Sequence, residues 1–152
     1  YKRQRHDLVG RVVWSRAPLD DPAADVFVEP RLLHSQDLEG SWWRVVDVKT
    51  ALGQRGYDVE GSLVLAITED ELAPWNNGRW RLDVGSDGAE VQATDAPADI
   101  ELSVRALSSL YSGHRSARHL ANAGLLAGEA LTVANLDRMM RTRFAPHCPD
   151  HY

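Results

Sequence analysis

The spacing of apolar residues changes once along this chain, near Pro97, and this change constrains the fold more than any other feature. Before it, the segments 59–68, 80–84 and 89–94 alternate apolar and polar residues as half-buried strands do. After it, apolar residues recur every three or four positions, the spacing of helices. Strands followed by helices, without repeated strand–helix units, predict an α+β fold: an antiparallel sheet with helices packed on one face.

Turn and cap signals place the elements within this outline. The tetrapeptide 85–88, Gly-Ser-Asp-Gly, separates two predicted strands, and Asp-Gly favours the positive backbone angles of a hairpin turn. Asp47 is expected to cap a short helix through Leu52. Three further helices are expected, with starts near Ser103, Ser116 and Thr132.

Residues 1–38 carry signals of their own. A strand is expected over Leu8–Trp14, a short helix from Pro22 to about Val28, and a second strand over Arg31–Leu38. The chain begins at a tyrosine without a helix cap, so we expect a piece of a longer protein. The alternative is a native start from which the leading residues were trimmed.

The charges are unevenly distributed. From Asp58 to Glu101 there are eleven acidic residues and two basic ones, whereas residues 1–19 hold five bases and one acid. The acidic segment is either a solvated sheet face or an attraction for cationic ligands. The basic start lacks interleaved aromatic residues, so no nucleic-acid partner is expected.

Location and redox state follow from what the sequence lacks. No apolar run approaches the length of a membrane span, and no signal peptide is evident, so a soluble chain without a membrane partner is expected. The single cysteine, Cys148, cannot form an internal disulfide. A cytoplasmic location is the default expectation.

Common catalytic and metal-binding motifs do not identify a function for this sequence. His147, Cys148 and His151 lie close together, but a zinc site needs a further ligand, and we expect an ordinary polar tail and no metal. No Gly-x-Ser-x-Gly elbow or phosphate-binding loop is present. Trp75, beside a proline and two asparagines, is the tryptophan expected to line a site.

Several separated motifs occur in one order along the chain: Trp43-Arg44-Val45-Val46-Asp47-Val48, Pro74-Trp75-Asn76-Asn77-Gly78-Arg79-Trp80-Arg81-Leu82, Ala98-Asp99-Ile100 continuing to Leu107, Leu110-Tyr111 with Gly113, and Ala145-Pro146 with Cys148-Pro149-Asp150. Together they resemble the C-terminal part of the enhanced intracellular survival family of GNAT acetyltransferases. The resemblance covers essentially the whole chain but only about the last third of the family's length. It implies a sterol carrier protein-like domain over 39–152 and, over 1–38, the trailing segment of a preceding acetyltransferase-like domain.

The resemblance also implies an activity. Family members are acetyl-CoA-dependent N-acetyltransferases that act on amines of aminoglycosides or other polyamines, and they form homo-oligomers, typically hexamers. The terminal carboxylate of an aromatic residue acts as general base, which here is Tyr152. His151 stands at the penultimate position, acidic in some members, with Asp150 as the nearest acidic substitute; both, with Trp75, are the expected substrate contacts.

Acetyl-CoA is held by the first domain of the family, and the GNAT pyrophosphate loop does not occur in this sequence. The chain alone is therefore expected to bind no cofactor and to be inactive. An α-carboxyl with a pKa of about 3.3 to 3.7 becomes a useful base at neutral pH only when burial raises that pKa. In the isolated chain the last residues are expected to fray.

Two other functions stay open. A sterol carrier-like fold could be a lipid- or sterol-binding carrier module, which needs an apolar tunnel between sheet and helices. A non-catalytic interaction domain is the second alternative.

Overall fold

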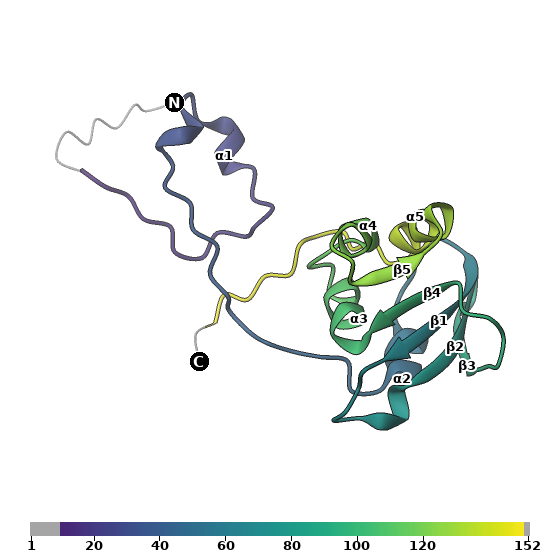
Figure 1. Ribbon diagram of the computed structural model, residues 1–152. Coiled ribbons are helices and arrows are strands. Elements are labelled where there is room, and N and C mark those ends of the chain that lie inside the picture. Colours follow the sequence, from purple (N-terminus) through teal and green to yellow (C-terminus); the bar gives the residue numbers. More distant parts are fainter. Residues whose placement is uncertain (1–9, 151–152) are drawn as a thin grey trace.

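The computed structural model describes residues 10–150 and places a five-stranded sheet at the centre of the fold (Figure 1). The strand order is β3-β2-β1-β4-β5. The strands are β1 (Gly61–Thr68), β2 (Gly78–Gly85), β3 (Gly88–Ala93), β4 (Ile100–Ser103) and β5 (Leu126–Gly128). The helices are α1 (Ala23–Val26), α2 (Val48–Gln54), α3 (Val104–Tyr111), α4 (Ala117–Asn122) and α5 (Ala130–Met139), with short 3-10 turns η1 (Pro30–Leu32) and η2 (Pro74–Asn76).

The expected α+β fold is confirmed, but the sheet is mixed rather than antiparallel. Three neighbouring pairs are antiparallel, whereas β1 and β4 pair in parallel, with Leu65 opposite Ile100. The β2–β3 hairpin occupies one side of β1, and the chain then crosses through 94–99 to pair on the other side. The expectation of an antiparallel sheet is therefore wrong for this pair, because alternation of apolar residues is the same in either strand direction.

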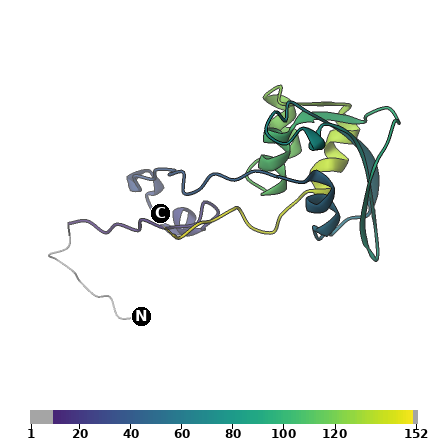
Figure 2. The same ribbon diagram turned by 90° about the horizontal axis from the view of Figure 1, so that it is seen from below.

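One face of the sheet carries the core. On β1 the alternating side chains of Leu63, Leu65 and Ile67 are at most 4% exposed and belong to the core cluster, together with side chains of the helices. The helices packed on the sheet lie on one side of it (Figure 2). The opposite face bears charged residues such as Arg81, which pairs in register with Gln92. Burying each large aliphatic side chain contributes about 1.5–3 kcal/mol, so this face holds sheet and helices together.

Local signals fix the starts of three helices. Ser103, Ser116 and Asp47 each cap a helix, accepting a backbone N–H from the residue three positions ahead. The last long helix, α5, begins at Ala130 rather than near Thr132. No side chain caps it, so the sequence carries no cap signal at its start.

The hairpin is also confirmed. Gly85 lies opposite Gly88 in the β2–β3 register, and Gly88 has a φ of +130°, which favours glycine. The apolar residues of β2 then face those of β3, with Leu82 opposite Val91.

Residues 10–38 differ from expectation. Residues 10–14, the described part of the expected Leu8–Trp14 strand, form no strand, and Val12 is 86% exposed. The expected strand over Arg31–Leu38 is also wrong: η1 is followed by irregular chain. The expected short helix is present as α1, where the Asp21 carboxylate accepts the Ala23 N–H. Apolar β-branched residues form a strand only beside a partner strand, and here none is paired with them.

One sequence expectation is not tested by these observations. The division at 38/39 between a trailing segment and the C-terminal domain stays a prediction. Among residues 10–150, no helix is both long and apolar enough to cross a membrane.

Candidate functional site

The C-terminal tail, residues 141–150, leaves α5 and extends away from the sheet toward the N-terminal segment (Figures 1 and 2). Its course is fixed at two points there. The Ala145 N–H donates to Asp20 Oδ2 at 2.9 Å, and a Cβ built on Gly40 would lie 3.4 Å from the Cys148 Cβ. The tail thus leads residues 141–150 away from the core of the domain.

Arg55, just after α2, holds the base of this tail. Its guanidinium donates to the Tyr111 carbonyl at 2.6 Å and to the Met140 carbonyl at 2.8 Å, with a longer contact of 3.5 Å to the Arg141 carbonyl. The same group lies 5.7 Å from the ring centre of Tyr57 and 5.2 Å from that of Tyr111. One cation therefore joins the ends of α3 and α5, where the tail begins.

A glycine leaves room for the next residue of the tail. Gly113 has a φ of +76°, and a Cβ built on it would lie 2.9 Å from the Thr142 Cβ and overlap that side chain further out. The Thr142 hydroxyl donates to the Phe144 carbonyl at 3.0 Å. Close approach at Gly113 and the carbonyls held by Arg55 together define where the tail leaves the domain.

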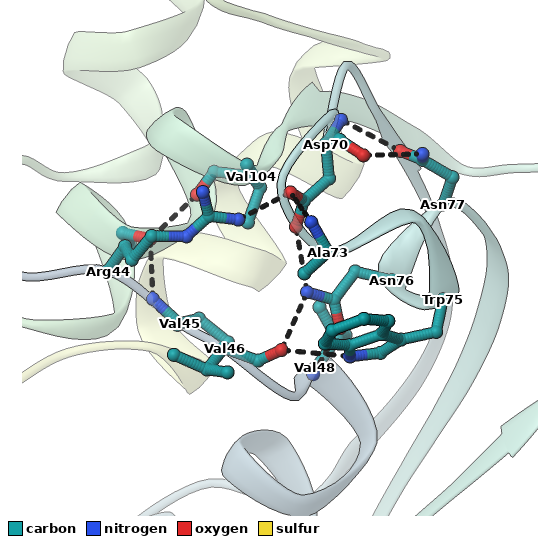
Figure 3. A network of polar contacts seen from close by, with 11 residues as sticks. Arg44, Val45, Val46, Val48, Asp70, Ala73, Trp75, Asn76, Asn77 and Val104 are labelled. Atoms are coloured by element: carbon teal, nitrogen blue, oxygen red, sulfur yellow. Dashed lines mark hydrogen bonds and ion pairs between the residues drawn. The ribbon is translucent and has the colours of Figure 1, made fainter.

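A second polar centre holds the segment through which the chain enters the sheet domain (Figure 3). We term this segment, residues 43–48, the lead-in segment. The Val45 N–H donates to the Ser108 hydroxyl and the Val48 N–H to Asn76 Oδ1, both at 2.9 Å. The Val46 carbonyl accepts from Asn76 Nδ2 at 2.9 Å. The lead-in segment is thereby bound along its length without being a strand.

Asp70 is the hub of this centre and is only 1% exposed. Its Oδ1 accepts from Arg44 at 2.5 Å and from the Ala73 N–H at 2.8 Å, and its Oδ2 accepts from Asn76 Nδ2 at 2.8 Å. Burial opposes ionisation, but these hydrogen bonds and the Arg44 charge outweigh it, so the Asp70 pKa lies below its ordinary value of 3.8. Asp70 is thus a buried carboxylate that stays charged, which suits a structural role better than that of a proton acceptor.

Trp75, one of the expected substrate contacts, borders this centre. Its indole Nε1 donates to the Val46 carbonyl at 3.1 Å, and its side chain is 61% exposed. Within residues 10–150 no hydrogen bond joins Trp75 to Asp150, whose carbonyl accepts only a long 3.8 Å contact from Cys148 Sγ. The other two expected site residues, His151 and Tyr152, lie outside the described residues.

The sequence analysis assigned no role to Arg55, Asp70, Asn76 or Ser108. Asp70 is one acid among the eleven between Asp58 and Glu101, and its partner Arg44 stands 26 positions away. Only Asn76 had a signal, because it lies in the Pro-Trp-Asn-Asn motif beside Trp75.

The described residues offer little room for other ligands. Within residues 10–150 no group of three His, Cys, Asp or Glu side chains is arranged to hold a metal; His151 lies outside that range. Two pockets of about 200 and 310 Å³ open to solvent, one beside Arg138 and Met139, the other beside Arg79 and Asp95. The first pocket meets the core at Met139, which is 3% exposed, and neither pocket is lined by Leu65 at the centre of the sheet.

Comparisons with known proteins bear on this arrangement. A family model described as "Sterol carrier protein domain" matches residues 48–149. An uncharacterized N-acetyltransferase of Streptomyces griseus is 37% identical over 140 residues, covering 89% of this chain and 32% of that protein. N-acetyltransferase Eis of Mycobacterium tuberculosis is 34% identical over 110 residues, covering 70% of this chain and 26% of that protein.

Solved structures agree with these relatives. The crystal structure of Eis1 from Mycobacterium abscessus superposes with a TM-score of 0.76 at 30% identity, covering 89% of this chain and 34% of that one. A GCN5-related N-acetyltransferase from Kribbella flavida has a TM-score of 0.65 at 25% identity, covering 90% of this chain and 35% of that one. The chain thus spans about a third of the length of the proteins it matches.

Proposed function

Because the chain belongs to the sterol carrier protein domain family, in the form found in the C-terminal region of Eis-family N-acetyltransferases, we propose that it is the C-terminal portion of an acetyl-CoA-dependent N-acetyltransferase. The proposed substrates are amines of aminoglycosides or polyamines. The chain contributes the terminal carboxylate of Tyr152 as general base, and Asp150, His151 and Trp75 as substrate contacts.

The observation that carries this proposal is the course of the tail. Residues 141–150 are held at their base by Arg55 and at Ala145 by Asp20, and they extend away from the sheet. An extended chain advances about 3.3–3.6 Å per residue, so the dozen residues after α5 can reach roughly 40 Å. A terminal carboxylate on such a tail is suited to a site on a neighbouring domain.

The chemistry requires a base at that point. A substrate ammonium must lose a proton before its nitrogen can attack the thioester carbonyl. The C–N bond would then form as the C–S bond breaks, and coenzyme A would leave as a thiolate that takes up the second proton of the attacking nitrogen. Acetyl-CoA, held by a domain outside this chain, supplies the acetyl group. The Tyr152 carboxylate takes the proton, and burial in a cleft raises its pKa from about 3.5 toward the range in which a base works at neutral pH.

The test uses the complete enzyme and acetyl transfer to an aminoglycoside. Appending one residue after Tyr152 moves the carboxylate by up to about 3.5 Å, beyond the hydrogen-bond reach of about 2.6–3.2 Å. Turnover is expected to fall about a hundredfold to ten-thousandfold, as for the loss of a positioned base. Deleting Tyr152 is expected to do the same.

The matched control is Tyr152→Phe, which keeps the terminal carboxylate and removes only the phenol. It should retain most activity, and thermal melting should show all three variants folded. Near-normal turnover of the extended variant would overturn the carboxylate role. Loss of activity in Tyr152→Phe alone would assign the role to the phenol instead.

The remaining parts of the proposal concern the complete protein. We expect it to be cytoplasmic and a homo-oligomer, with a hexamer implied by the family resemblance, which light scattering would test. A lipid carrier is the weaker alternative, because the inner-face side chains Leu65, Leu107 and Leu136 are each 0% exposed and fill the space a tunnel would need. A non-catalytic interaction domain predicts that none of the Tyr152 variants alters turnover.

A further inference from the structure

Arg55 stands where three parts of the fold converge. It follows α2, and its guanidinium contacts the last carbonyl of α3, at Tyr111, and the carbonyl of Met140, which caps the end of α5. The carbonyl ends of helices carry partial negative charge, so two helix dipoles point at one cation. The third carbonyl, of Arg141, already belongs to the tail.

The buried guanidinium of Arg55 is not fully satisfied by hydrogen bonds. The Nε of Arg55 is buried and has no hydrogen-bond partner among residues 10–150. An unsatisfied buried donor destabilises the folded state, and a smaller or apolar side chain at this position would avoid that loss. What arginine supplies in return is a planar fork that holds two carbonyls in fixed directions while its face lies on tyrosine rings.

Two of the carbonyls that Arg55 contacts, those of Met140 and Arg141, lie where the tail begins. Met140 and Arg141 are the first residues after α5, and Thr142, the next, lies against Gly113. Because one rotated peptide at the base of an extended tail displaces every residue beyond it, small errors there grow toward the terminus. Ala145, bound to Asp20, is the next fixed point.

We propose that Arg55 is a positioning residue, whose fork on the Tyr111 and Met140 carbonyls sets the course of the C-terminal tail and thereby the place of the terminal carboxylate. Its effect on catalysis rests on the function proposed above; its effect on the tail does not. Arg55 is not among the proposed substrate contacts, and the effect proposed for it is on the position of the tail.

The test is Arg55→Lys in the complete protein. Lysine keeps the positive charge near both helix ends and both rings, but it cannot reproduce the planar fork. Hydrogen exchange of the peptide spanning 141–150 reports the order of the tail directly. The control is Arg105→Lys, the same change at an exposed arginine of α3.

In Arg55→Lys we expect faster exchange over 141–150 and a kcat lowered about tenfold to a hundredfold, as for a misplacement of about 1 Å. The KM for acetyl-CoA should stay unchanged, because its site belongs to another domain. The acid limb of the pH–rate profile should move to lower pH, because a loosened carboxylate is better solvated and its pKa falls back toward the ordinary value. Arg105→Lys should match the parent in every respect.

Should Arg55→Lys melt, Asp20→Ala provides a second variant, because it removes only the exposed contact to Ala145. It should speed exchange of the tail and lower kcat in the same direction, by less. Unchanged exchange in folded Arg55→Lys overturns the proposal, as does faster exchange with unaltered kcat and acid limb while the Tyr152 extension still abolishes turnover. If the extended variant keeps full turnover, the proposed function fails, and tail exchange alone then decides the role of Arg55.

Discussion

Asp70→Asn tests whether the buried polar centre holds the domain together. The carboxamide oxygen can still accept from Arg44 and Ala73, which share Oδ1, but it no longer carries a full charge. The carboxamide nitrogen takes the place of Oδ2 and meets Asn76 Nδ2, which is also a donor. Asn76 cannot turn its amide over, because its Oδ1 accepts the Val48 N–H at 2.9 Å.

These contacts set the expected magnitude. Weakening two charge-assisted bonds to neutral ones costs about 1 kcal/mol each, and two buried donors facing each other cost about 1–3 kcal/mol. The sum agrees with the 3–5 kcal/mol typical of breaking a buried ion pair. Arg44 keeps 33% of its side chain exposed and can turn to water, so we expect a loss of about 3 kcal/mol in the free energy of unfolding.

The assay is denaturant unfolding followed by tryptophan fluorescence, to which Trp75 and Trp80 report from beside the site. The matched control is Asp47→Asn, the same change at an exposed helix cap, where asparagine caps about as well and the loss should stay within about 0.5 kcal/mol. If Asp70→Asn loses no more than Asp47→Asn, the reasoning from the buried donors is refuted.

The pH dependence gives a second readout of Asp70. Its pKa is lower in the folded state, so the unfolded chain binds the proton first as the pH falls. The stabilisation is full above the ordinary pKa of 3.8 and is lost as the pH falls from there through the folded pKa. Asp70→Asn should therefore show a shallower loss of stability below about pH 4 than the parent does.

Two further changes address the tail and the arginine that holds it. Gly113→Ala should lower the free energy of unfolding by about 1–2 kcal/mol because of the positive φ, and by more because the new Cβ overlaps Thr142. The control is Gly124→Ala, at a φ of +71° with nothing within 4 Å of the added Cβ, which should show the backbone cost alone. Equal melting temperatures of the two variants would contradict the clash with Thr142. Burial raises the pKa of Tyr57 to about 12, so the parent should lose stability as the pH rises from about 10 through 12, because the unfolded tyrosine ionises first. Tyr57→Phe should lack that loss in urea unfolding at pH 9 and 11, and equal slopes in both proteins would argue against a raised pKa.

What could be predicted from the sequence is what neighbouring residues determine. The caps at Asp47, Ser103 and Ser116 and the hairpin at 85–88 depend on side chains within three positions of the backbone groups they satisfy. Such local signals do not depend on how the rest of the chain folds. The family resemblance added the type of domain, similar to sterol carrier proteins, and the family model that matches residues 48–149 confirms it.

What could not be predicted depends on partners far apart in the chain. The ion pair of Arg44 with Asp70 spans 26 positions, and the contact of Arg55 with Met140 spans 85. Arg55 directly follows α2, between Gly53 and Gly56, where the sequence indicates only the end of a helix. The proposed roles of Asp150, His151 and Tyr152 stay predictions, because His151 and Tyr152 lie outside the described residues and no contact of Asp150 tests its role.

The parallel pairing of β1 with β4 implies an order of events during folding. The β2–β3 hairpin closes across Gly85 and Gly88, three positions apart, whereas Leu65 must find Ile100 across 35. By the logarithmic dependence of loop entropy on length, the second closure costs about 2 kcal/mol more. The β1–β2–β3 meander should therefore form before β4 pairs with β1. That later pairing should join the meander and the helical half of the chain into one cooperatively folding unit.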